Sequence, residues 1–124
     1  MESVKPVAWI GSSYKDFRSF PDPVQDVMGF ALFLAQTGKI HCDAKPLKGF
    51  GGAGVLEVVD DHQGDTYRAV YTVKFEEAVY VLHAFQKKSK QGRKTPPQDI
   101  EMIRRRLKAA EDHQRQHQTP RGSA

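Results

Sequence analysis

The middle of the chain contains two largely apolar runs whose residue types are typical of β-strands. Residues 67–75 and 78–86 are rich in β-branched and aromatic side chains and contain neither proline nor glycine. Such runs are typical of strands on a half-buried sheet. Only Glu76 and Glu77 separate the two runs, so the pattern predicts an antiparallel hairpin with a two-residue loop.

The register of this hairpin decides which side chains share a face of the sheet. With a two-residue loop, Arg68 lies opposite Phe85 and Val70 lies opposite His83, and opposed residues share a face. One face would then carry Arg68, Val70, Thr72, Lys74, Val79, Val81, His83, Phe85 and Lys87. The other, apolar face would carry Tyr67, Ala69, Tyr71, Tyr80, Leu82 and Ala84. An odd-length loop or a β-bulge would exchange the faces of one strand.

Two helices are predicted before the hairpin. Residues 14–20 form a short helix that Pro21 ends, and a second helix starts with the cap residue Asp22 and the proline Pro23 and ends before Gly38. The apolar stripe of the second helix consists of Val24, Val27, Met28, Ala31, Leu34 and Ala35. This stripe is expected to cover the apolar face of the sheet.

Two short apolar runs, residues 6–10 and 55–59, predict further strands, the first of them at the side of the sheet. The glycine-rich residues 39–53 are predicted to be a flexible connection. Their glycines could instead cradle a phosphate, although the GK[ST] ending of a P-loop is absent.

A third helix is predicted near the C-terminus, where Thr95, Pro96 and Gln98 repeat the pattern of a cap, a first-turn proline and a glutamine. Its apolar stripe consists of Ile100, Ile103, Leu107 and Ala110. An arginine triplet at 104–106 lies beside this stripe. From residue 113 the periodicity is lost, so the sequence predicts one domain over residues 1–112 and a disordered tail over 113–124.

Composition agrees with one small basic domain. The chain has 124 residues and a net charge of +4, and nine basic residues fall within positions 87–108, where Asp99 and Glu101 are the only acids. That local excess predicts a surface suited to a polyanion. The single cysteine, Cys42, excludes an internal disulfide, and the sequence shows neither a membrane span nor a signal peptide, so a soluble cytoplasmic protein is expected. No cofactor or metal site is predicted, since His41, Cys42 and Asp43 lack a second ligand cluster.

Several motifs together resemble the RelE superfamily of toxins from toxin–antitoxin systems. The strand YRAVY, the strand end YVLHAFQKKS and the helix start KTP, preceded by KPLKGFGGAGVLEV, are similar to its HigB-like, phage-derived branch over roughly residues 7–110. The resemblance implies an α+β, RelE-like fold: a small, largely antiparallel sheet, N-terminal helices packed on one face, and a C-terminal helix. It also implies a cytoplasmic enzyme that cuts mRNA, usually on the ribosome, and a partner antitoxin, a helix–turn–helix protein.

The resemblance makes Arg68, His83, Lys87 and Glu57 candidates for catalysis. The arginine of the family's Y-R strand stabilises the transition state at the scissile phosphate, and Arg68 matches it; a guanidinium can fork two hydrogen bonds onto phosphate oxygens. The alternative is a surface ion pair with Glu57, which falls opposite Arg68 if residues 61–64 form the turn. His83 could move a proton near neutral pH or be a hydrogen-bonded core residue.

The candidates for RNA binding are Lys74, Phe85, Lys88, Lys90, Arg93 and Lys94. Cations at a strand end would neutralise backbone phosphates, and an aromatic ring can stack on a base. Relatives carry lysines on the strand before Y-R, where this chain has Glu57, and their near-terminal tyrosine has no clear equivalent. The assignment of general base and general acid among Glu57, His83 and Lys87 therefore stays open.

Two other functions fit the same pattern. A ParE-like toxin shares the fold but inhibits DNA gyrase and cleaves nothing. A noncatalytic nucleic-acid-binding or regulatory module would explain the basic surface equally well.

Overall fold

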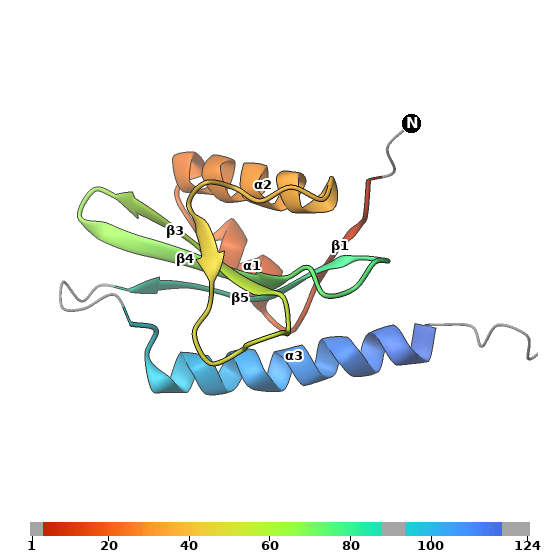
Figure 1. Cartoon of the computed structure of the whole chain (residues 1–124). Coiled ribbons are helices and arrows are strands. Elements are labelled where there is room, and N and C mark those ends of the chain that lie inside the picture. The colour runs from red at the N-terminus through yellow and green to blue at the C-terminus, as the bar shows by residue number, and fades with distance from the viewer. Residues whose placement is uncertain (1–3, 88–93, 118–124) are drawn as a thin grey trace, which may run out of the picture.

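Five strands form one sheet that has helices on both of its faces (Figure 1). The computed structural model describes residues 4–87 and 94–117. In chain order the elements are β1 (Val7–Trp9), α1 (Ser13–Arg18), α2 (Asp22–Gln36), β2 (Ala44–Pro46), β3 (Val55–His62), β4 (Asp65–Thr72), β5 (Val79–Lys87) and α3 (Pro97–His117). The strand order is β1-β5-β4-β3-β2, and only the β1–β5 pair is parallel. The predicted α+β arrangement with a largely antiparallel sheet is confirmed.

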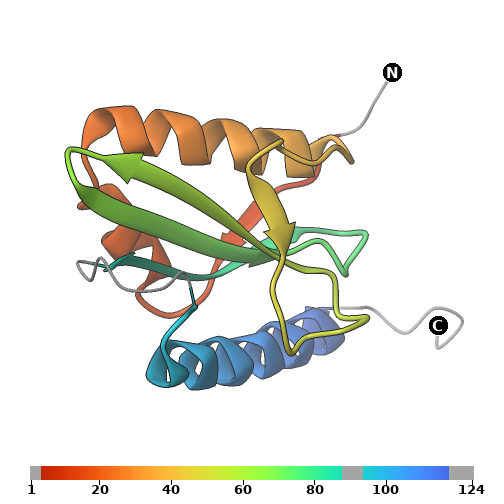
Figure 2. The same ribbon diagram turned by 60° about the vertical axis from the view of Figure 1, so that its left-hand side comes forward.

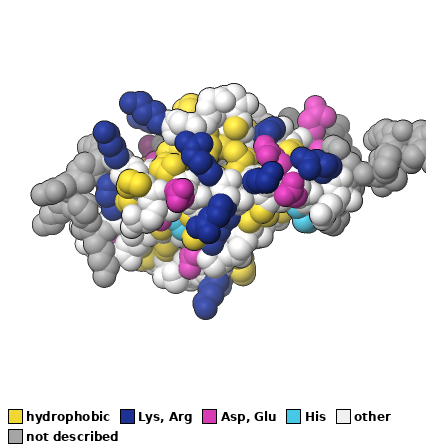
Figure 3. Space-filling model, turned by 90° about the horizontal axis from the view of Figure 1, so that it is seen from below, with side chains coloured by type: hydrophobic (Ala, Val, Ile, Leu, Met, Phe, Trp, Pro, Cys, Tyr) yellow, Lys and Arg dark blue, Asp and Glu magenta, His cyan; other side chains and the backbone are white. Residues whose placement is uncertain are grey.

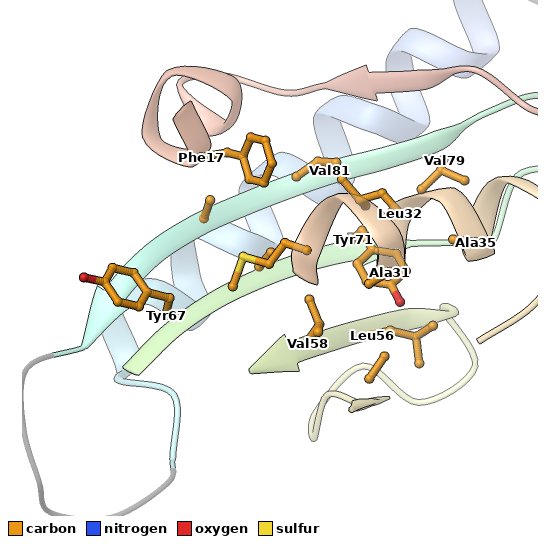
Figure 4. Packing of buried hydrophobic residues seen from close by; sticks show 14 of the residues in the cluster. Phe17, Ala31, Leu32, Ala35, Leu56, Val58, Tyr67, Tyr71, Val79 and Val81 are labelled. Carbon is orange, nitrogen blue, oxygen red and sulfur yellow. The ribbon is translucent and has the colours of Figure 1, made fainter. Parts of the chain in front are cut away.

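The two N-terminal helices cover one face of the sheet and α3 covers the other (Figure 2). On the first face α2 buries Val24, Met28, Ala31, Leu32 and Ala35. The predicted stripe is therefore right in phase, although Leu32 is buried where Leu34 was expected. Phe17 of α1 and the sheet residues complete this core (Figure 4).

A second apolar core lies between the sheet and α3. Its buried members are Phe50, Val55, Val70, Ala78, Tyr80, Leu82, Ile103 and Ala110, with Ile100 and Leu107 packed against them. The predicted apolar stripe of the C-terminal helix is thus confirmed. Phe50 comes from the glycine-rich connection, which also contains the strand β2, so this connection is more ordered than the sequence predicted.

The β4–β5 hairpin keeps the predicted register at one end and departs from it at the other. Arg68 pairs with Phe85 and Val70 with His83, as predicted, but Leu82 is an extra residue in β5 without a partner in β4. This β-bulge shifts the pairing, because one inserted residue exchanges the faces of the rest of the strand.

The bulge reverses the predicted faces of the first half of β5. Val79 and Val81 lie on the side of α1 and α2 (Figure 4), whereas Tyr80 and Leu82 lie on the side of α3. The predicted two-residue loop is also wrong, since residues 73–78 separate the two strands.

The β3–β4 turn is shorter than the sequence predicted. His62 pairs with Asp65, so Gln63 and Gly64 alone form the turn, with φ angles of 51° and 86°. Two consecutive positive φ angles are typical of a type I′ hairpin turn. Glu57 is consequently paired with Val70 and not with Arg68, which corrects the predicted pairing.

The helix α3 begins and ends later than predicted. Its first helical residue is Pro97, and the hydroxyl of Thr95 donates a hydrogen bond to Glu57 instead of capping the helix. The helix also continues to His117, so the predicted disordered tail is wrong for residues 113–117, while residues 118–124 lie outside the described residues. In the part of the chain that the structure describes, no helix combines the length and apolar character needed to cross a membrane.

Candidate functional site

The four predicted catalytic residues lie on the α3 side of the sheet. Arg68 is on β4, His83 and Lys87 are on β5, and Glu57 is on β3. The pairing of β4 with β5 places Arg68 and His83 on the same face, one diagonal step apart, which corresponds to roughly 7–8 Å. Both residues are buried, with 4% of Arg68 and 8% of His83 exposed.

Arg68 forms a buried ion pair with the neighbouring strand. Its Nη1 atom lies 3.1 Å from Oε1 of Glu57, and the two side chains are 5% and 11% exposed. The other carboxylate oxygen of Glu57 accepts a hydrogen bond of 2.9 Å from the hydroxyl of Thr95. The Nε atom of Arg68 is buried and has no hydrogen-bond partner among the described residues. The ion pair considered at the sequence level therefore exists, but it is buried, and one donor of the guanidinium is unused.

Both ring nitrogens of His83 are engaged. The Nε2 atom lies 2.8 Å from Oδ1 of Asp99, and the Nδ1 atom lies 3.4 Å from Nη1 of Arg106. Because a guanidinium can only donate, Nδ1 must accept, so Nε2 carries the proton and donates it to Asp99. The ring also stacks on Phe85, with ring centroids 4.8 Å apart. In this conformation His83 is a hydrogen-bonded, buried histidine, which is one of the two alternatives that the sequence left open.

One short segment contacts the predicted catalytic residues from the α3 side. We call residues 94–99 the α3 start. The carbonyl of Lys94 accepts a hydrogen bond of 2.6 Å from Lys87, Thr95 binds Glu57, and Asp99 binds His83. The α3 start thus holds the site in a closed arrangement.

Asp99 and Arg106 contact His83, and neither was among the residues that the sequence predicted for the site. Arg106 donates hydrogen bonds to the carbonyl of Leu82 at 3.0 Å and to the hydroxyl of Ser12 at 3.1 Å. Burial lowers the pKa of Arg106, and the nearby Asp16 carboxylate partly opposes this shift. A signal for both residues was present in the sequence: Asp99, Ile103, Arg106 and Ala110 follow one another at spacings of four, three and four. Such spacings place all of them on the sheet-facing stripe of one helix.

The α3 side of the molecule carries exposed basic side chains with acids between them (Figure 3). Arg104, Arg105 and Lys108 are exposed, and Arg104 lies over the ring of Phe50 at 4.6 Å. The predicted RNA-binding residue Lys74 is paired with Glu111 at 2.7 Å. Of the other predicted RNA-binding residues, Phe85 and Lys94 are described, whereas Lys88, Lys90 and Arg93 lie outside the described residues.

A separate group of possible metal ligands lies before β2. The donor atoms of His41, Cys42 and Asp43 are all within 4.8 Å of one another. The Nδ1 atom of His41 already accepts a hydrogen bond from the backbone N–H of Asp43, and the other two side chains are exposed. The three donors come from consecutive residues, so the group is sparse for a metal that takes four ligands.

Comparison with known proteins identifies the family. The family model described as "Phage derived protein Gp49-like" matches residues 15–108. No curated protein matches the chain. Among solved structures, the toxin–antitoxin complex RelBE2 from Mycobacterium tuberculosis is similar at a TM-score of 0.46 and 18% identity, over 72% of this chain and 98% of that chain. Since the family model matches well over half of the sequence, the chain belongs to the phage-derived Gp49-like family.

Proposed function

We propose that the protein is the toxin of a toxin–antitoxin system, in the HigB-like branch of the RelE superfamily. It would act in the cytoplasm as a metal-independent endoribonuclease that cuts mRNA on the ribosome. Membership of the Gp49-like family and the motifs around Arg68 support this proposal. The observation that carries it is the buried guanidinium of Arg68, whose unused Nε donor lies on the face of the sheet that also holds His83. An unsatisfied buried donor in a native structure calls for an explanation, and a phosphate oxygen would satisfy it.

The proposed reaction is attack of a ribose 2′-hydroxyl on the adjacent phosphate, which leaves a 2′,3′-cyclic phosphate. Arg68 stabilises the charge of the pentacovalent transition state, while His83 or Glu57 moves the protons. The RNA strand would be bound by Lys87 and Lys94. The other predicted RNA-binding residues, which would bind it too, are Lys74, Phe85, Lys88, Lys90 and Arg93.

Access of RNA to Arg68 requires Thr95, near the beginning of the α3 start, to move away from Glu57. Arg68 is 4% exposed, and the hydroxyl of Thr95 binds the same carboxylate that Arg68 binds. When Thr95 leaves Glu57, a phosphate can reach the Nε atom of Arg68. The proposed partner that holds the toxin inactive is an antitoxin, a helix–turn–helix protein, that covers or distorts this face.

Mapping RNA 5′ ends after induction of the protein in cells tests the proposal. The wild-type chain should produce new 5′ ends within translated mRNA. Arg68→Lys keeps the charge beside Glu57 but loses the planar fork, so it should remain folded and slow cleavage by about 100-fold. Arg18→Lys, at an exposed arginine of α1, is the matched control and should cleave like the wild type.

Other outcomes identify the alternative functions. DNA damage without RNA cleavage would indicate a ParE-like gyrase inhibitor. Neither effect, with RNA still bound in vitro, would indicate a noncatalytic module. Equal cleavage by the wild type and Arg68→Lys would remove Arg68 from the mechanism.

A further inference from the structure

We propose that Arg106 is a second arginine at the reacting phosphate, beside His83, and that Asp99 is a positioning residue that selects the proton-accepting nitrogen of His83. The inference rests on the proposed function and adds two residues to its site. It follows from the contacts that join α3 to β5.

Asp99 selects the tautomer of the imidazole. Its carboxylate lies 2.8 Å from Nε2 of His83, and the two side chains are 20% and 10% exposed. A carboxylate that accepts the Nε2 proton leaves the lone pair of Nδ1 for proton transfer and stabilises the imidazolium that forms. The nitrogen that can act as a base is therefore Nδ1, which faces Arg106 and not the α3 start.

Arg106 differs from Arg68 in having only neutral atoms in direct contact. Its hydrogen bonds go to the carbonyl of Leu82, the hydroxyl of Ser12 and Nδ1 of His83, and within residues 4–87 and 94–117 it makes no ion pair. The carboxylate of Asp16 is one residue removed, because it accepts a hydrogen bond of 2.8 Å from Ser12. The charge of Arg106 is thus available to an anion, whereas Glu57 neutralises that of Arg68.

The reacting phosphate can meet Arg106 and Nδ1 of His83 from the side of Gly11 and Ser12, while its contact with Arg68 still requires Thr95 to leave Glu57. Arg106 is half-buried. Its guanidinium lies next to the exposed residues Gly11 and Ser12 on one side and next to the ring of His83 on the other. Its 3.4 Å contact with Nδ1 of His83 is long for a hydrogen bond and weak. A ribose 2′-hydroxyl can replace that contact, while the guanidinium turns its donors to the phosphate.

The resulting step balances as follows. Nδ1 of His83 takes the proton of the 2′-hydroxyl as the bond from the 2′-oxygen to phosphorus forms. The bond from phosphorus to the 5′-oxygen breaks, and water gives that oxygen a proton. The imidazolium then returns its proton to solvent. Arg106 compensates the negative charge on the phosphate oxygens during the step.

A pair of adjacent arginines tests the role of Arg106. Arg106→Gln should slow cleavage of ribosome-bound mRNA by about 100-fold, the loss typical of one transition-state donor. It should also weaken binding of a non-cleavable 2′-O-methyl RNA. Arg105→Gln removes the same charge from an exposed position of the same helix, where among the described residues its guanidinium contacts the sulfur of Met102, and should change both values far less.

Gly11→Ala moves the guanidinium without removing its charge. A Cβ atom at residue 11 would lie 2.9 Å from Cζ of Arg106, so the end of this flexible side chain must shift away. The residue has a φ of +58°, where an alanine is strained, so the variant is less stable than the wild type. Cleavage should fall while the folded state, checked by circular dichroism, persists.

The tautomer of His83 tests the role of Asp99. Nitrogen-15 NMR of the wild-type protein should show the Nε2–H form of His83, and Asp99→Asn should mix or reverse the tautomers. Asp99→Asn should lower kcat with little change in KM, and Asp99→Glu should restore part of the rate. Glu101→Gln, at an exposed position two residues along α3, should leave both the tautomer and the rate unchanged.

The inference fails if Arg106→Gln cleaves and binds like Arg105→Gln, or if Asp99→Asn keeps both the wild-type tautomer and rate. These failures leave the proposed function intact as long as the wild type cleaves. If the wild type does not cleave, the proposed function fails, and binding of 2′-O-methyl RNA and the NMR spectra still decide whether Arg106 contacts the phosphate and Asp99 sets the tautomer.

Discussion

Two buried tyrosines on opposite faces of the sheet have different hydroxyl environments. Tyr71 is 0% exposed, and its hydroxyl has no hydrogen-bond partner among the described residues. Tyr80 is 2% exposed, and its hydroxyl contacts Nδ1 of His113 at 2.8 Å and Oε1 of Gln114 at 3.1 Å. An unsatisfied buried hydroxyl costs roughly 1–3 kcal/mol, whereas a satisfied one contributes about 1 kcal/mol.

Removal of these two hydroxyls should have opposite effects on stability. Tyr71→Phe should raise the free energy of unfolding by about 1 kcal/mol, since it removes only an unpaired polar atom. Tyr80→Phe should lower it by a similar amount. Urea unfolding of both variants beside the wild type measures the two changes. A loss of stability in Tyr71→Phe equal to that in Tyr80→Phe would mean that the Tyr71 hydroxyl is bound.

Tyr71 also makes the stability of the fold sensitive to alkaline pH. Burial raises the pKa of Tyr71 from 10.0 to about 12. The unfolded chain therefore releases this proton first, so the stability linked to it is complete below pH 10 and is lost as the pH rises towards 12. Urea unfolding from pH 9 to pH 12 should show a smaller loss for Tyr71→Phe than for the wild type. Parallel curves would contradict the assigned shift.

At the scale of elements, α3 is longer than its apolar stripe suggests, because its last turns are held by polar contacts. Gln114 is 7% exposed and joins the hydroxyl of Tyr80 on β5 to the carboxylate of Glu77. Polar residues do not register in a pattern of apolar positions. The continuation of the helix past residue 112 was therefore invisible to that pattern.

These contacts predict the effect of truncating the helix. A chain that ends at Asp112 should unfold with about 1–2 kcal/mol less free energy than one that ends at His117, because Tyr80 and Glu77 lose their partners. Full-length Gln114→Ala should reproduce most of the loss, whereas Gln116→Ala, at an exposed position, should not. Identical urea midpoints for the two truncated chains would show that the last turns add nothing.

At the scale of the whole molecule, one sheet is shared by two apolar cores. The core between the sheet and the helices α1 and α2, and the core between the sheet and α3, both contain residues from β3, β4 and β5. Loss of either layer exposes one face of the same strands. The two layers should therefore unfold together, as small domains usually do.

A destabilising substitution on one face of the sheet should accordingly lower the unfolding midpoint of the layer on the other face as well. Ile103→Ala in α3 removes a fully buried side chain and should cost about 2–5 kcal/mol. The only tryptophan, Trp9, packs on Phe17 in the opposite layer. Its fluorescence and the far-ultraviolet circular dichroism should shift to the same lower urea midpoint. Separate midpoints would show that α3 leaves the sheet alone.

The amino-acid sequence by itself determined the three helices, four of the five strands and their order along the chain, but not the short strand β2. Runs of β-branched and aromatic residues, proline and glycine positions and helical stripes act over a few residues, and they predict the α+β arrangement, the phase of α2 and the common face of Arg68 and His83. These features depend on local sterics and on which side of an element is apolar, and short segments of sequence determine both.

Only the tertiary structure decided the bulge at Leu82 and the contacts of His83 with Asp99 and Arg106. It also decided that the ion pair between Glu57 and Arg68 forms diagonally across the two strands. The partners of His83 are 16 and 23 residues away in the sequence. The packing of α3 against the sheet sets which polar groups meet, because each buried charge must find its partner in the arrangement that also fills both apolar cores. No local sequence pattern predicts which polar groups meet, since this depends on the packing of the whole molecule.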